Sequence, residues 1–272
     1  ARTTFGVPAR APWLIEVDDA AALDDVLALP QVVDGETLVI GGGSNLLFAG
    51  DAPGAVIAMA THDLRVLSDD GVHALVRADA GVAWHPLVMW TLEQGLCGLE
   101  NLALIPGTAG ASPIQNIGAY GTEVGEFIDI VEAFDRRNGT RVRLDRDACA
   151  FAYRDSVFKR DADRYLVTAV EFRLPRTPTL RLDYAGIRDE LGAMGIADPT
   201  ARDVGNAVIR IRQRKLPDPA VVGNAGSFFK NPVVTAPVLD AIRREHPDAV
   251  AYPQADGLFK LAAGWLIERA GW

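Results

Sequence analysis

The sequence predicts an α+β fold, built from small sheets and helices rather than from a regular strand–helix repeat. Segments with strand patterns and segments with helical spacing follow one another irregularly along the chain. Two long stretches, residues 105–125 and 217–232, concentrate glycine and proline and mix them with Asn, Ser and other polar residues. Irregular segments of this length inside a compact domain are more often functional than accidental.

The first elements follow from apolar patterning and from capping residues. Trp13–Val17 predicts a strand, and Asp18 and Asp19 then suit the N-cap of a helix over Ala20–Leu29, which Pro30 ends. Apolar runs predict three further strands, over Thr37–Ile40, Ala55–Met59 and His73–Ala78.

The rest of the chain adds a helix, a hairpin and further helices. From Trp84 to Gln94 the apolar residues recur at helical spacing, and Gly95 stands where a C-cap is expected. Asn138-Gly139 suits the tip of a hairpin. The remaining predicted elements are hairpin strands Val131–Asp135 and Thr140–Leu144, a strand over Tyr165–Leu174, and helices over Ala201–Arg214, Ala236–Glu245 and Leu258–Ala270.

Composition and charge exclude several classes of protein. The 272 residues are 49% hydrophobic and 23% charged, which argues against disorder. Lys and Arg number 27 and Asp and Glu number 36, so the net charge is 27 − 36 = −9. This balance argues against a nucleic-acid-binding protein with a wholly basic surface. It still allows a local cationic pocket for a small anionic ligand.

The cysteines, histidines and apolar runs indicate where the protein works. Cys97 and Cys149 are the two cysteines, and the four histidines are scattered, so we expect neither a disulfide framework nor a metal site. Apolar runs stay below the roughly 18–20 residues that span a bilayer. The N-terminal residues 1–6 lack the apolar core of a signal peptide. We expect a cytoplasmic protein with no membrane partner.

The first candidate motif is Gly41-Gly42-Gly43-Ser44-Asn45, directly after a predicted buried strand. Consecutive backbone N–H groups in such a turn can form an anion-binding nest. The motif is neither a dinucleotide-binding G-x-G-x-x-G pattern nor a P-loop. A phosphate site and a tight structural turn therefore both remain open.

The second candidate is the segment from Gly98 to Gly121. Its small residues would let a flat ligand lie against the backbone, and Ser112, Gln115 and Asn116 could supply hydrogen bonds. The alternative is a buried loop that satisfies its own polar groups.

Three further motifs carry charged or reactive side chains. In Tyr153-Arg154-Asp155-Ser156, Arg154 could bind a carboxylate as a fork, or pair with Asp155 at the surface. Residues 210–215 form a cationic cluster, which could bind an anion or simply favour the dipole at a helix end. In residues 223–232, Ser227 could be a proton donor or nucleophile, or a capping serine beside a core Phe pair.

Taken in order, these motifs resemble the UDP-N-acetylenolpyruvoylglucosamine reductase family, whose flavin-binding fold is of the vanillyl-alcohol-oxidase type. Tyr184 and Tyr252 point to the longer form of the family, which has a tyrosine loop. The segments that carry the resemblance are Thr4–Gly6, Gly41–Asn45, Asn101–Tyr120, Tyr153–Ser156, Lys215–Pro219, Gly223–Pro232, Tyr252–Gly257 and Lys260–Ile267.

The resemblance implies an FAD-binding domain pair, residues 1–60 and 61–214, followed by an α+β substrate domain, residues 215–272. It implies that the pyrophosphate of FAD meets the backbone of the glycine-rich turn, while the second segment wraps the cofactor. The FAD-binding residues implied are Gly41, Gly42, Gly43, Ser44, Asn45, Pro106, Gly107, Ser112, Asn116, Gly118, Ala119 and Arg212.

The activity implied is hydride transfer from NADPH to FAD and then to an enolpyruvyl sugar nucleotide, which becomes UDP-N-acetylmuramate. Arg154 would stabilise the negative charge that develops in the substrate carboxylate, and Ser227 would protonate the adjacent carbon. The other substrate-binding residues implied are Tyr120, Tyr153, Tyr184, Lys215, Asn231 and Tyr252. A bacterial cytoplasmic monomer that serves peptidoglycan synthesis, and with it cell division, follows from the same resemblance.

Two alternatives and one departure accompany this interpretation. The chain could be a flavin oxidase of the same superfamily, or a module that binds FAD or a UDP-sugar without turnover. The family continues beyond the part that matches Lys260–Trp272 and there carries a glutamate that assists protonation, a role that Glu268 does not match. Because the sequence stops inside a helical pattern, which would leave apolar surface exposed, we expect the protein to continue past Trp272.

Overall fold

The computed structural model describes residues 3–184, 186–224, 226 and 229–272. Contacts divide the chain into two compact units, residues 1–224 and residues 225–272, and each is described by itself. Among the described residues, no helix has both the length and the apolar character needed to cross a membrane. The predicted domain division at residues 60 and 214 stays a prediction.

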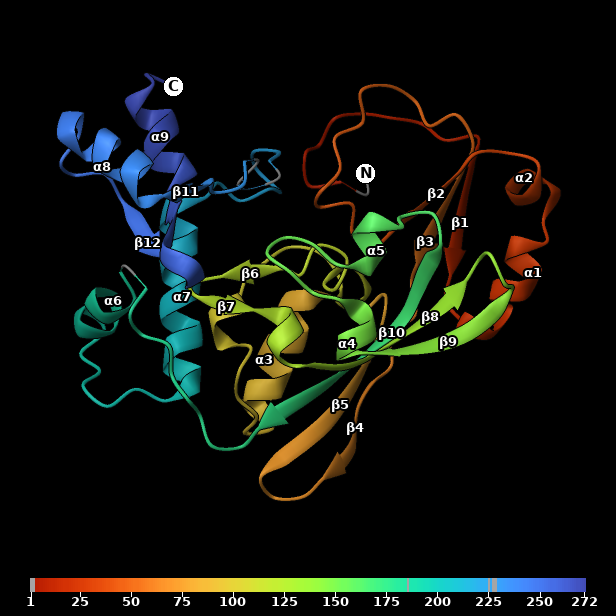
Figure 1. Ribbon diagram of the computed structural model, residues 1–272. Helices are drawn as coiled ribbons and strands as arrows, with labels where there is room; N and C mark the ends of the chain where they lie inside the picture. Colours follow the sequence, from red (N-terminus) through yellow and green to blue (C-terminus); the bar gives the residue numbers. More distant parts are fainter. Residues whose placement is uncertain (1–2, 185, 225, 227–228) are drawn as a thin grey trace. The chain divides into compact units, whose positions relative to one another are not determined.

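The first unit begins with a small parallel sheet in the order β1-β3-β2 (Figure 1). Its strands are β1 (Trp13–Val17), β2 (Thr37–Ile40) and β3 (Ala55–Met59), as the sequence predicts. The central strand, β3, is buried along its whole length because a neighbour pairs with each of its edges. This sheet delivers the glycine-rich turn, which leaves the end of β2.

The single helix predicted over residues 20–29 is wrong. A 3-10 turn, η1 (Ala20–Ala22), leads into α1 (Leu23–Leu27), and α2 (Pro30–Val33) follows. The carboxylate of Asp19 does cap the start, where it accepts from the N–H of Ala21 at 2.8 Å. Pro30 begins α2 because its fixed φ and missing N–H suit the first position of a helix.

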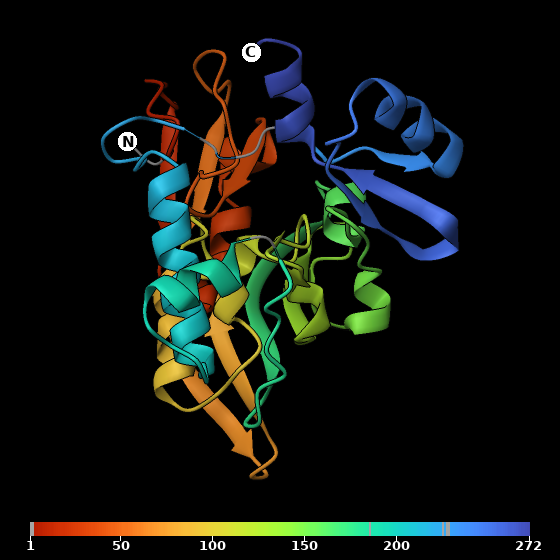
Figure 2. The same cartoon turned by 90° about the vertical axis from the view of Figure 1, so that its left-hand side faces the viewer.

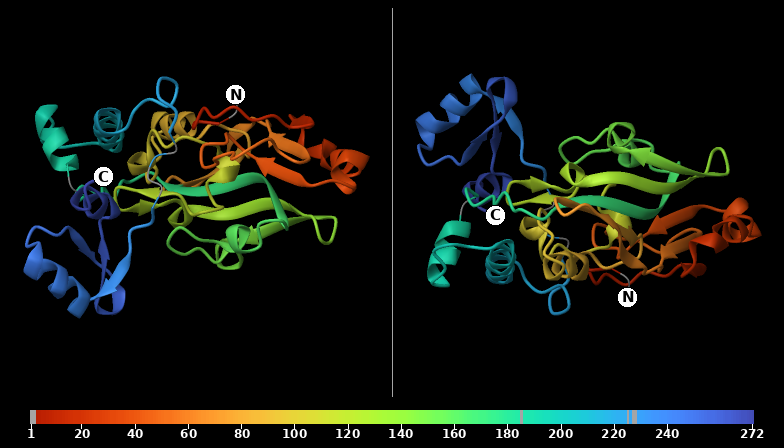
Figure 3. Two further views of the ribbon diagram at one scale, coloured as in Figure 1. Left: turned by 90° about the horizontal axis from the view of Figure 1, so that it is seen from above. Right: turned by 90° about the horizontal axis from the view of Figure 1, so that it is seen from below.

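A five-stranded antiparallel sheet in the order β4-β5-β10-β8-β9 forms the centre of the first unit. Phe134 and Leu166 of this sheet pack with Leu23 and Ile57 of the N-terminal layer, so the two sheets share a core (Figure 3). The strands are β4 (Leu64–Asp69), β5 (His73–Asp79), β8 (Ile128–Asp135), β9 (Thr140–Asp145) and β10 (Tyr165–Pro175).

Helices and short turns complete the main core of this unit. The long helix α7 (Ala201–Lys215) lies between α6 (Ile187–Ala193) and α3 (Trp84–Glu93), as Figures 1 and 2 show. The capping box of Thr200 and Asp203 starts α7, and a buried apolar face holds the helix on the core. The short elements are η2 (Glu100–Leu102), η3 (Ala109–Ala111), β6 (Gly118–Ala119), β7 (Thr122–Glu123), η4 (Val124–Glu126), α4 (Arg146–Cys149) and α5 (Val157–Arg160).

The second unit is a three-stranded antiparallel sheet with two helices. The strands β11 (Val233–Thr235), β12 (Ala251–Pro253) and β13 (Leu258–Leu261) stand in the order β11-β13-β12. The helices are α8 (Ala236–Glu245) and α9 (Ala263–Arg269), and η5 spans Ala255–Gly257.

One prediction for the second unit is half wrong. The helix predicted over residues 258–270 begins only at Ala263, and Leu258–Leu261 is instead the central strand of the sheet. Asp256 and Gly257 both have positive φ, 57° and 68°, and this turn lays β13 antiparallel to β12. Tertiary pairing on both edges of β13 outweighs the helical spacing of its apolar residues.

Candidate functional site

The glycine-rich turn after β2 packs directly against the second glycine-rich segment. A Cβ at Gly41 would lie 2.4 Å from the Oγ1 atom of Thr108, and a Cβ at Gly42 would lie 3.4 Å from the Cα of Gly107. Gly107 has a φ of +118°, which side chains rarely allow. Glycine at position 41 therefore avoids the Thr108 side chain, and glycine at position 107 allows the positive φ.

Side chains reinforce the contact between the two segments. The hydroxyl of Ser44 donates to the carbonyl of Pro106 at 3.2 Å, and the amide of Asn45 donates to Oε1 of Gln115 at 3.0 Å. The Oγ1 atom of Thr108 is buried and has no hydrogen-bond partner among the described residues. The two segments form one surface that is poor in side chains and holds a hydroxyl able to hydrogen-bond a ligand.

Backbone strain gathers around the second segment. Six non-glycine residues in the described ranges have positive φ; three of them lie within this loop, and a fourth contacts it. Such conformations cost roughly 1–3 kcal/mol each and persist where the surroundings enforce them, often at functional sites. The four residues are Leu104, Asn116, Tyr120 and Arg154.

Arg154 lies against this loop. Its guanidinium donates to the carbonyl of Gly118 and, at 3.4 Å, to the carbonyl of Asn116. A Cβ at Gly118 would lie 2.7 Å from Nη1 of Arg154, so the missing side chain makes room for the guanidinium. Its Cζ also stands 5.2 Å from the centroid of the Tyr153 ring. The loop thus holds a fixed cation.

The alternative ion pair between Arg154 and Asp155 does not form. Asp155 pairs with Arg160 instead, at 2.5 Å, and the nearest acidic group recorded for Arg154 is Glu123, at 3.9 Å. The positive φ of Arg154, +55°, turns its side chain toward the loop and away from its neighbour in sequence.

The side chains of two predicted ligand donors form hydrogen bonds within the loop and to a neighbouring segment. The hydroxyl of Ser112 donates to the carbonyl of Ala109 at 2.7 Å. The amide of Asn116 donates to Glu123 at 2.8 Å and to the carbonyl of Ala152 at 3.1 Å, while its oxygen accepts from the N–H of Gly125 at 2.9 Å. These side chains shape the loop, and the backbone groups of both residues are also hydrogen-bonded within the protein.

The three arginines of α7 divide between two faces of the helix. Arg210 and Arg214, four residues apart, both pair with the buried carboxylate of Glu190 on α6. Hydrogen bonding from Arg214 holds the pKa of Glu190 below its usual value. Arg212 lies on the opposite face, hydrogen-bonds Tyr120 and interacts with His85, while its Nε is buried without a recorded partner among the described residues. Arg212 is therefore the arginine that faces the loop.

Burial shifts the pKa values of Arg212 and of the groups around it. Burial lowers the pKa of Arg212 and raises the pKa of Tyr120. Burial, and then the nearby Arg212 charge, lower the pKa of His85. The Nδ1 atom of His85 accepts from the N–H of Leu104 at 3.1 Å, so the neutral ring carries its proton on Nε2. The sequence suggests only packing or capping for His85, because its partners come from α7 and from the loop.

The remaining predicted residues lie partly in the first unit and partly in the second. The rings of Tyr120 and Tyr184 meet edge to face, with centroids 5.3 Å apart. Lys215 is the exposed last residue of α7, whereas Ser227 lies outside the described residues. In the second unit, Oδ1 of Asn231 accepts from the first N–H of α9 at 2.9 Å. Tyr252 on β12 stands opposite Lys260 on β13.

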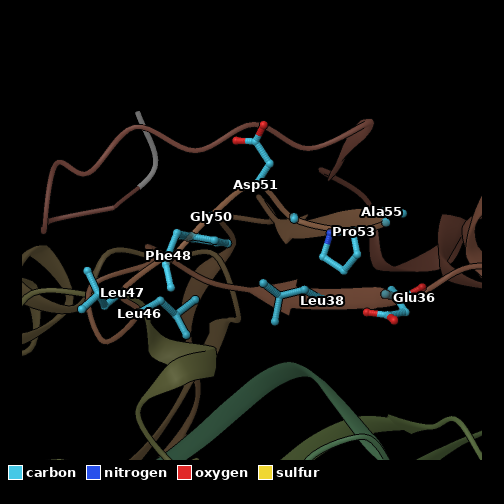
Figure 4. A pocket seen from close by; sticks show the side chains of 13 residues that line it. Glu36, Leu38, Leu46, Leu47, Phe48, Gly50, Asp51, Pro53 and Ala55 are labelled. Atoms are coloured by element: carbon cyan, nitrogen blue, oxygen red, sulfur yellow. The ribbon is translucent and has the colours of Figure 1, made fainter.

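A pocket and two cysteines lie apart from this arrangement. A pocket of 470 Å³ beside β2 and β3 is lined by Leu38, residues 46–55 and their neighbours, with an apolar floor (Figure 4). Cys97 and Cys149 are buried free thiols, and burial raises the pKa of Cys149 to about 12. In the described part of the chain no group of acidic, His and Cys side chains is placed to hold a metal ion.

The geometry defines what this site can do. A backbone surface with few side chains adjoins a fixed guanidinium, a second, partly buried arginine and a pair of tyrosines. Fixed donors of this kind stabilise negative charge where it develops during a reaction. The arrangement suits a bound nucleotide cofactor beside an anionic substrate.

Comparisons with known proteins agree with this geometry. The FAD binding domain family matches residues 12–145. A UDP-N-acetylenolpyruvoylglucosamine reductase from Xanthomonas oryzae pv. oryzae is 56% identical, over 100% of this chain and 80% of its own length. The enzyme of that name from Xanthomonas campestris pv. campestris is also 56% identical, over 100% of this chain and 78% of its own. A crystal structure of the reductase from Thermus caldophilus shares the fold, with a TM-score of 0.63 at 23% identity over 99% of this chain and 90% of its own.

Proposed function

Because the chain belongs to the UDP-N-acetylenolpyruvoylglucosamine reductase family, we propose that it reduces UDP-N-acetylglucosamine enolpyruvate to UDP-N-acetylmuramate at the expense of NADPH. The full-chain identity and the FAD-binding match confirm the predicted family, the α+β fold with its vanillyl-alcohol-oxidase-type FAD domain, and the class of FAD-dependent oxidoreductase. The observation that carries the specific reaction is Arg154, a fixed cation on the surface of the glycine-rich loop.

The residues present fit FAD as the cofactor. Glycines at positions 41, 42 and 107 leave the backbone of the turn without side chains, so that its N–H groups can approach a phosphate, and the unpartnered Thr108 hydroxyl can donate to one. Arg212 would add a cation toward the same phosphates. When bound, FAD supplies the hydride chemistry, and the protein supplies binding, orientation and electrostatics.

Arg154 would act on the substrate carboxylate. Addition of hydride to the enolpyruvyl group moves negative charge into that carboxylate, and a preorganised guanidinium stabilises the charge without rearrangement. The carbonyls of Asn116 and Gly118 accept from Nη1 and Nη2 of the guanidinium, so the loop fixes its orientation. This arrangement lowers the barrier more than a mobile lysine would.

The proton and the nucleotide require further residues, assigned here as part of the proposal. Ser227 protonates the carbon next to the carboxylate, and the strongly basic intermediate makes a weak acid sufficient. The remaining substrate-binding side chains are Tyr120, Tyr153, Tyr184, Lys215, Asn231 and Tyr252. We propose a bacterial cytoplasmic monomer that serves peptidoglycan synthesis and cell division.

The Ser227→Ala variant tests this proposal by separating its two half-reactions. FAD reduction by NADPH should proceed as in the wild type, because it needs no proton from Ser227. Reduction of the enolpyruvyl sugar nucleotide should fail. If both half-reactions are unchanged, Ser227 is not the acid. Turnover of an alcohol with oxygen, in place of the sugar nucleotide, would identify a flavin oxidase and overturn the proposal.

A further inference from the structure

The turn that carries Arg154 is short and tightly closed. Ala152 and Asp155 exchange two backbone hydrogen bonds, of 3.0 and 3.1 Å, so Tyr153 and Arg154 form the tip between them. Arg154 has a φ of 55°, a conformation that a residue other than glycine keeps only where its surroundings enforce it. The direction of the guanidinium therefore depends on the contacts that hold this turn.

The residue that ends the turn, Ser156, ties it to the second glycine-rich segment. Its hydroxyl donates to the carbonyl of Ile114 at 2.6 Å, and the residue is 0% exposed. Ser156 is also the N-cap of α5, where a serine usually accepts from an N–H of its own helix. Among the described residues its side chain makes no such capping bond. The fold uses this hydroxyl to join two segments rather than to begin a helix.

The helix that Ser156 begins also contacts the turn. The backbone N–H of Lys159 donates to the carbonyl of Ser156 at 3.2 Å, which fixes Lys159 relative to the start of α5. The Nζ atom of Lys159 then donates to the backbone carbonyl of Arg154 at 3.1 Å. Ser156 thus holds the turn against the second glycine-rich segment, while Lys159 holds the carbonyl of Arg154 itself.

We infer that Ser156, supported by Lys159, is a positioning residue for Arg154, because it sets where the guanidinium stands relative to the FAD-binding segment. The inference rests on the proposed function, in which Arg154 stabilises the charge on the substrate carboxylate. That charge develops only as hydride reaches the substrate, so a displaced guanidinium should slow this step and spare the reduction of FAD by NADPH.

The size of the effect follows from the contacts that remain. Ser156→Ala removes the donor to the Ile114 carbonyl and frees the turn to shift, and a misplacement on the order of 1 Å can slow a reaction by about 100-fold. The guanidinium keeps its own bonds to the carbonyls of Asn116 and Gly118. We therefore expect a smaller loss, of about tenfold.

The experiment compares FAD-loaded Ser156→Ala with the wild type by stopped-flow absorbance. The rate at which the enolpyruvyl sugar nucleotide reoxidises the reduced enzyme should fall about tenfold, and the rate of reduction by NADPH should stay within about twofold. Fluorescence titration should give an FAD affinity within about twofold of the wild type, because the side chains of Ser112 and Asn116 still shape the segment.

Lys159 gives a second test that leaves the core intact, because its side chain is exposed. Lys159→Met should slow the same reoxidation step by about threefold, the usual effect of losing one hydrogen bond. Lys159→Arg can still donate to the carbonyl of Arg154 and should react like the wild type. If Ser156→Ala is too unstable to assay, an unchanged rate in Lys159→Met overturns the inference.

A double variant shows whether Ser156 acts through Arg154. In an Arg154→Lys background, Ser156→Ala should slow reoxidation by less than about twofold further, because the guanidinium that it positions is already absent. A further loss of about tenfold, as large as in the wild-type background, would show that Ser156 acts by another route and would overturn the inference.

Thr91→Val is the matched control, because it removes another buried hydroxyl-to-carbonyl hydrogen bond. Oγ1 of Thr91 donates to the carbonyl of Val88 at 2.8 Å on α3, and Thr91 is 1% exposed. The variant should keep the wild-type reoxidation rate even where its melting temperature falls. An unchanged reoxidation rate in Ser156→Ala, or an equal loss in both half-reactions, would overturn the inference. Wild-type enzyme that fails to turn over the sugar nucleotide would instead overturn the proposed function.

Discussion

Arg154 donates a hydrogen bond from its guanidinium to the backbone carbonyl of Gly118. The contact joins the cation proposed for the substrate carboxylate to a residue proposed for FAD binding. It is possible because Gly118 has no side chain and because Arg154 adopts a positive φ. Cofactor loop and cation are therefore fixed by the same local structure.

The first prediction concerns Arg154. Arg154→Lys keeps a positive charge but cannot donate to the carbonyls of Asn116 and Gly118 while it also holds a carboxylate. We expect the rate at which reduced enzyme is reoxidised by substrate to fall roughly 100-fold, the usual effect of losing such a donor. Stopped-flow absorbance measures this rate directly. FAD reduction by NADPH serves as the internal control, and an equal loss in both steps would contradict the assigned role.

The second prediction concerns Gly41. In Gly41→Ala the new Cβ would lie 2.4 Å from the Thr108 hydroxyl oxygen, so the Thr108 side chain or the turn itself must shift. We expect FAD to bind roughly 5- to 150-fold more weakly, since overpacking costs about 1–3 kcal/mol. Fluorescence titration with FAD measures the affinity.

Two variants test the cause of that loss. Gly41→Ala/Thr108→Ala removes the clash together with the proposed phosphate donor, so it should bind FAD about as well as Thr108→Ala alone. Gly192→Ala adds a Cβ into open space on α6 and should bind FAD like the wild type. Wild-type affinity in Gly41→Ala itself would show that this turn does not contact the cofactor.

The third prediction separates the arginines of α7. Arg212→Lys should weaken FAD binding, because Arg212 faces the loop with an unpartnered buried Nε. Arg210→Lys should leave FAD affinity unchanged and instead reduce thermal stability slightly, because Arg210 pairs with Glu190 on the other face. Paired measurements of FAD affinity and Tm distinguish the two outcomes. The reverse pattern would show that the faces of α7 are wrongly assigned.

The fourth prediction is a pH dependence at His85. Burial and the Arg212 charge place the folded-state pKa of His85 below its ordinary value of 6.5. The unfolded chain therefore binds the proton more tightly, so the free energy of unfolding should fall as the pH drops below about 6.5. His85→Asn keeps an acceptor for the Leu104 N–H and does not titrate.

Urea unfolding at several pH values checks this dependence. As the pH falls from 8 to 5, the free energy of unfolding of the wild type should decrease relative to that of His85→Asn. Any stability advantage of the wild type should therefore shrink or reverse. A pH-independent difference would mean that His85 keeps an ordinary pKa in the folded protein.

Local patterns were sufficient where a residue's role is local. The strands β1, β2 and β3, the Asn138-Gly139 hairpin and helices α3, α7 and α8 agree with caps, turns and apolar spacing. Leu258–Leu261 was misassigned because pairing with two strands, which spacing cannot show, decides its conformation. At residues 20–33 the local signals were present but allowed two interpretations, because a proline can end one helix or begin the next, as Pro30 begins α2.

The candidate site, like the fold, could be predicted only in part from the sequence. The glycine turn and the loop were visible as motifs, but their mutual contact through Gly41 and Thr108 depends on tertiary structure. From the spacing alone, the arginines of α7 could be predicted only to point in different directions around the helix. The sequence does not show that Arg212, rather than Arg210, faces the loop. His85 and Ser156 gave no local signal of their contacts, because each acts through a partner distant in sequence.

The most direct test is anaerobic absorbance of the purified protein through one catalytic cycle. The account predicts a flavin band that NADPH bleaches and that UDP-N-acetylglucosamine enolpyruvate then restores, with UDP-N-acetylmuramate formed in equal amount to the flavin reoxidised. A bleached band that the enolpyruvyl substrate does not restore would contradict the proposed reaction. A protein that binds no FAD would contradict the cofactor site itself.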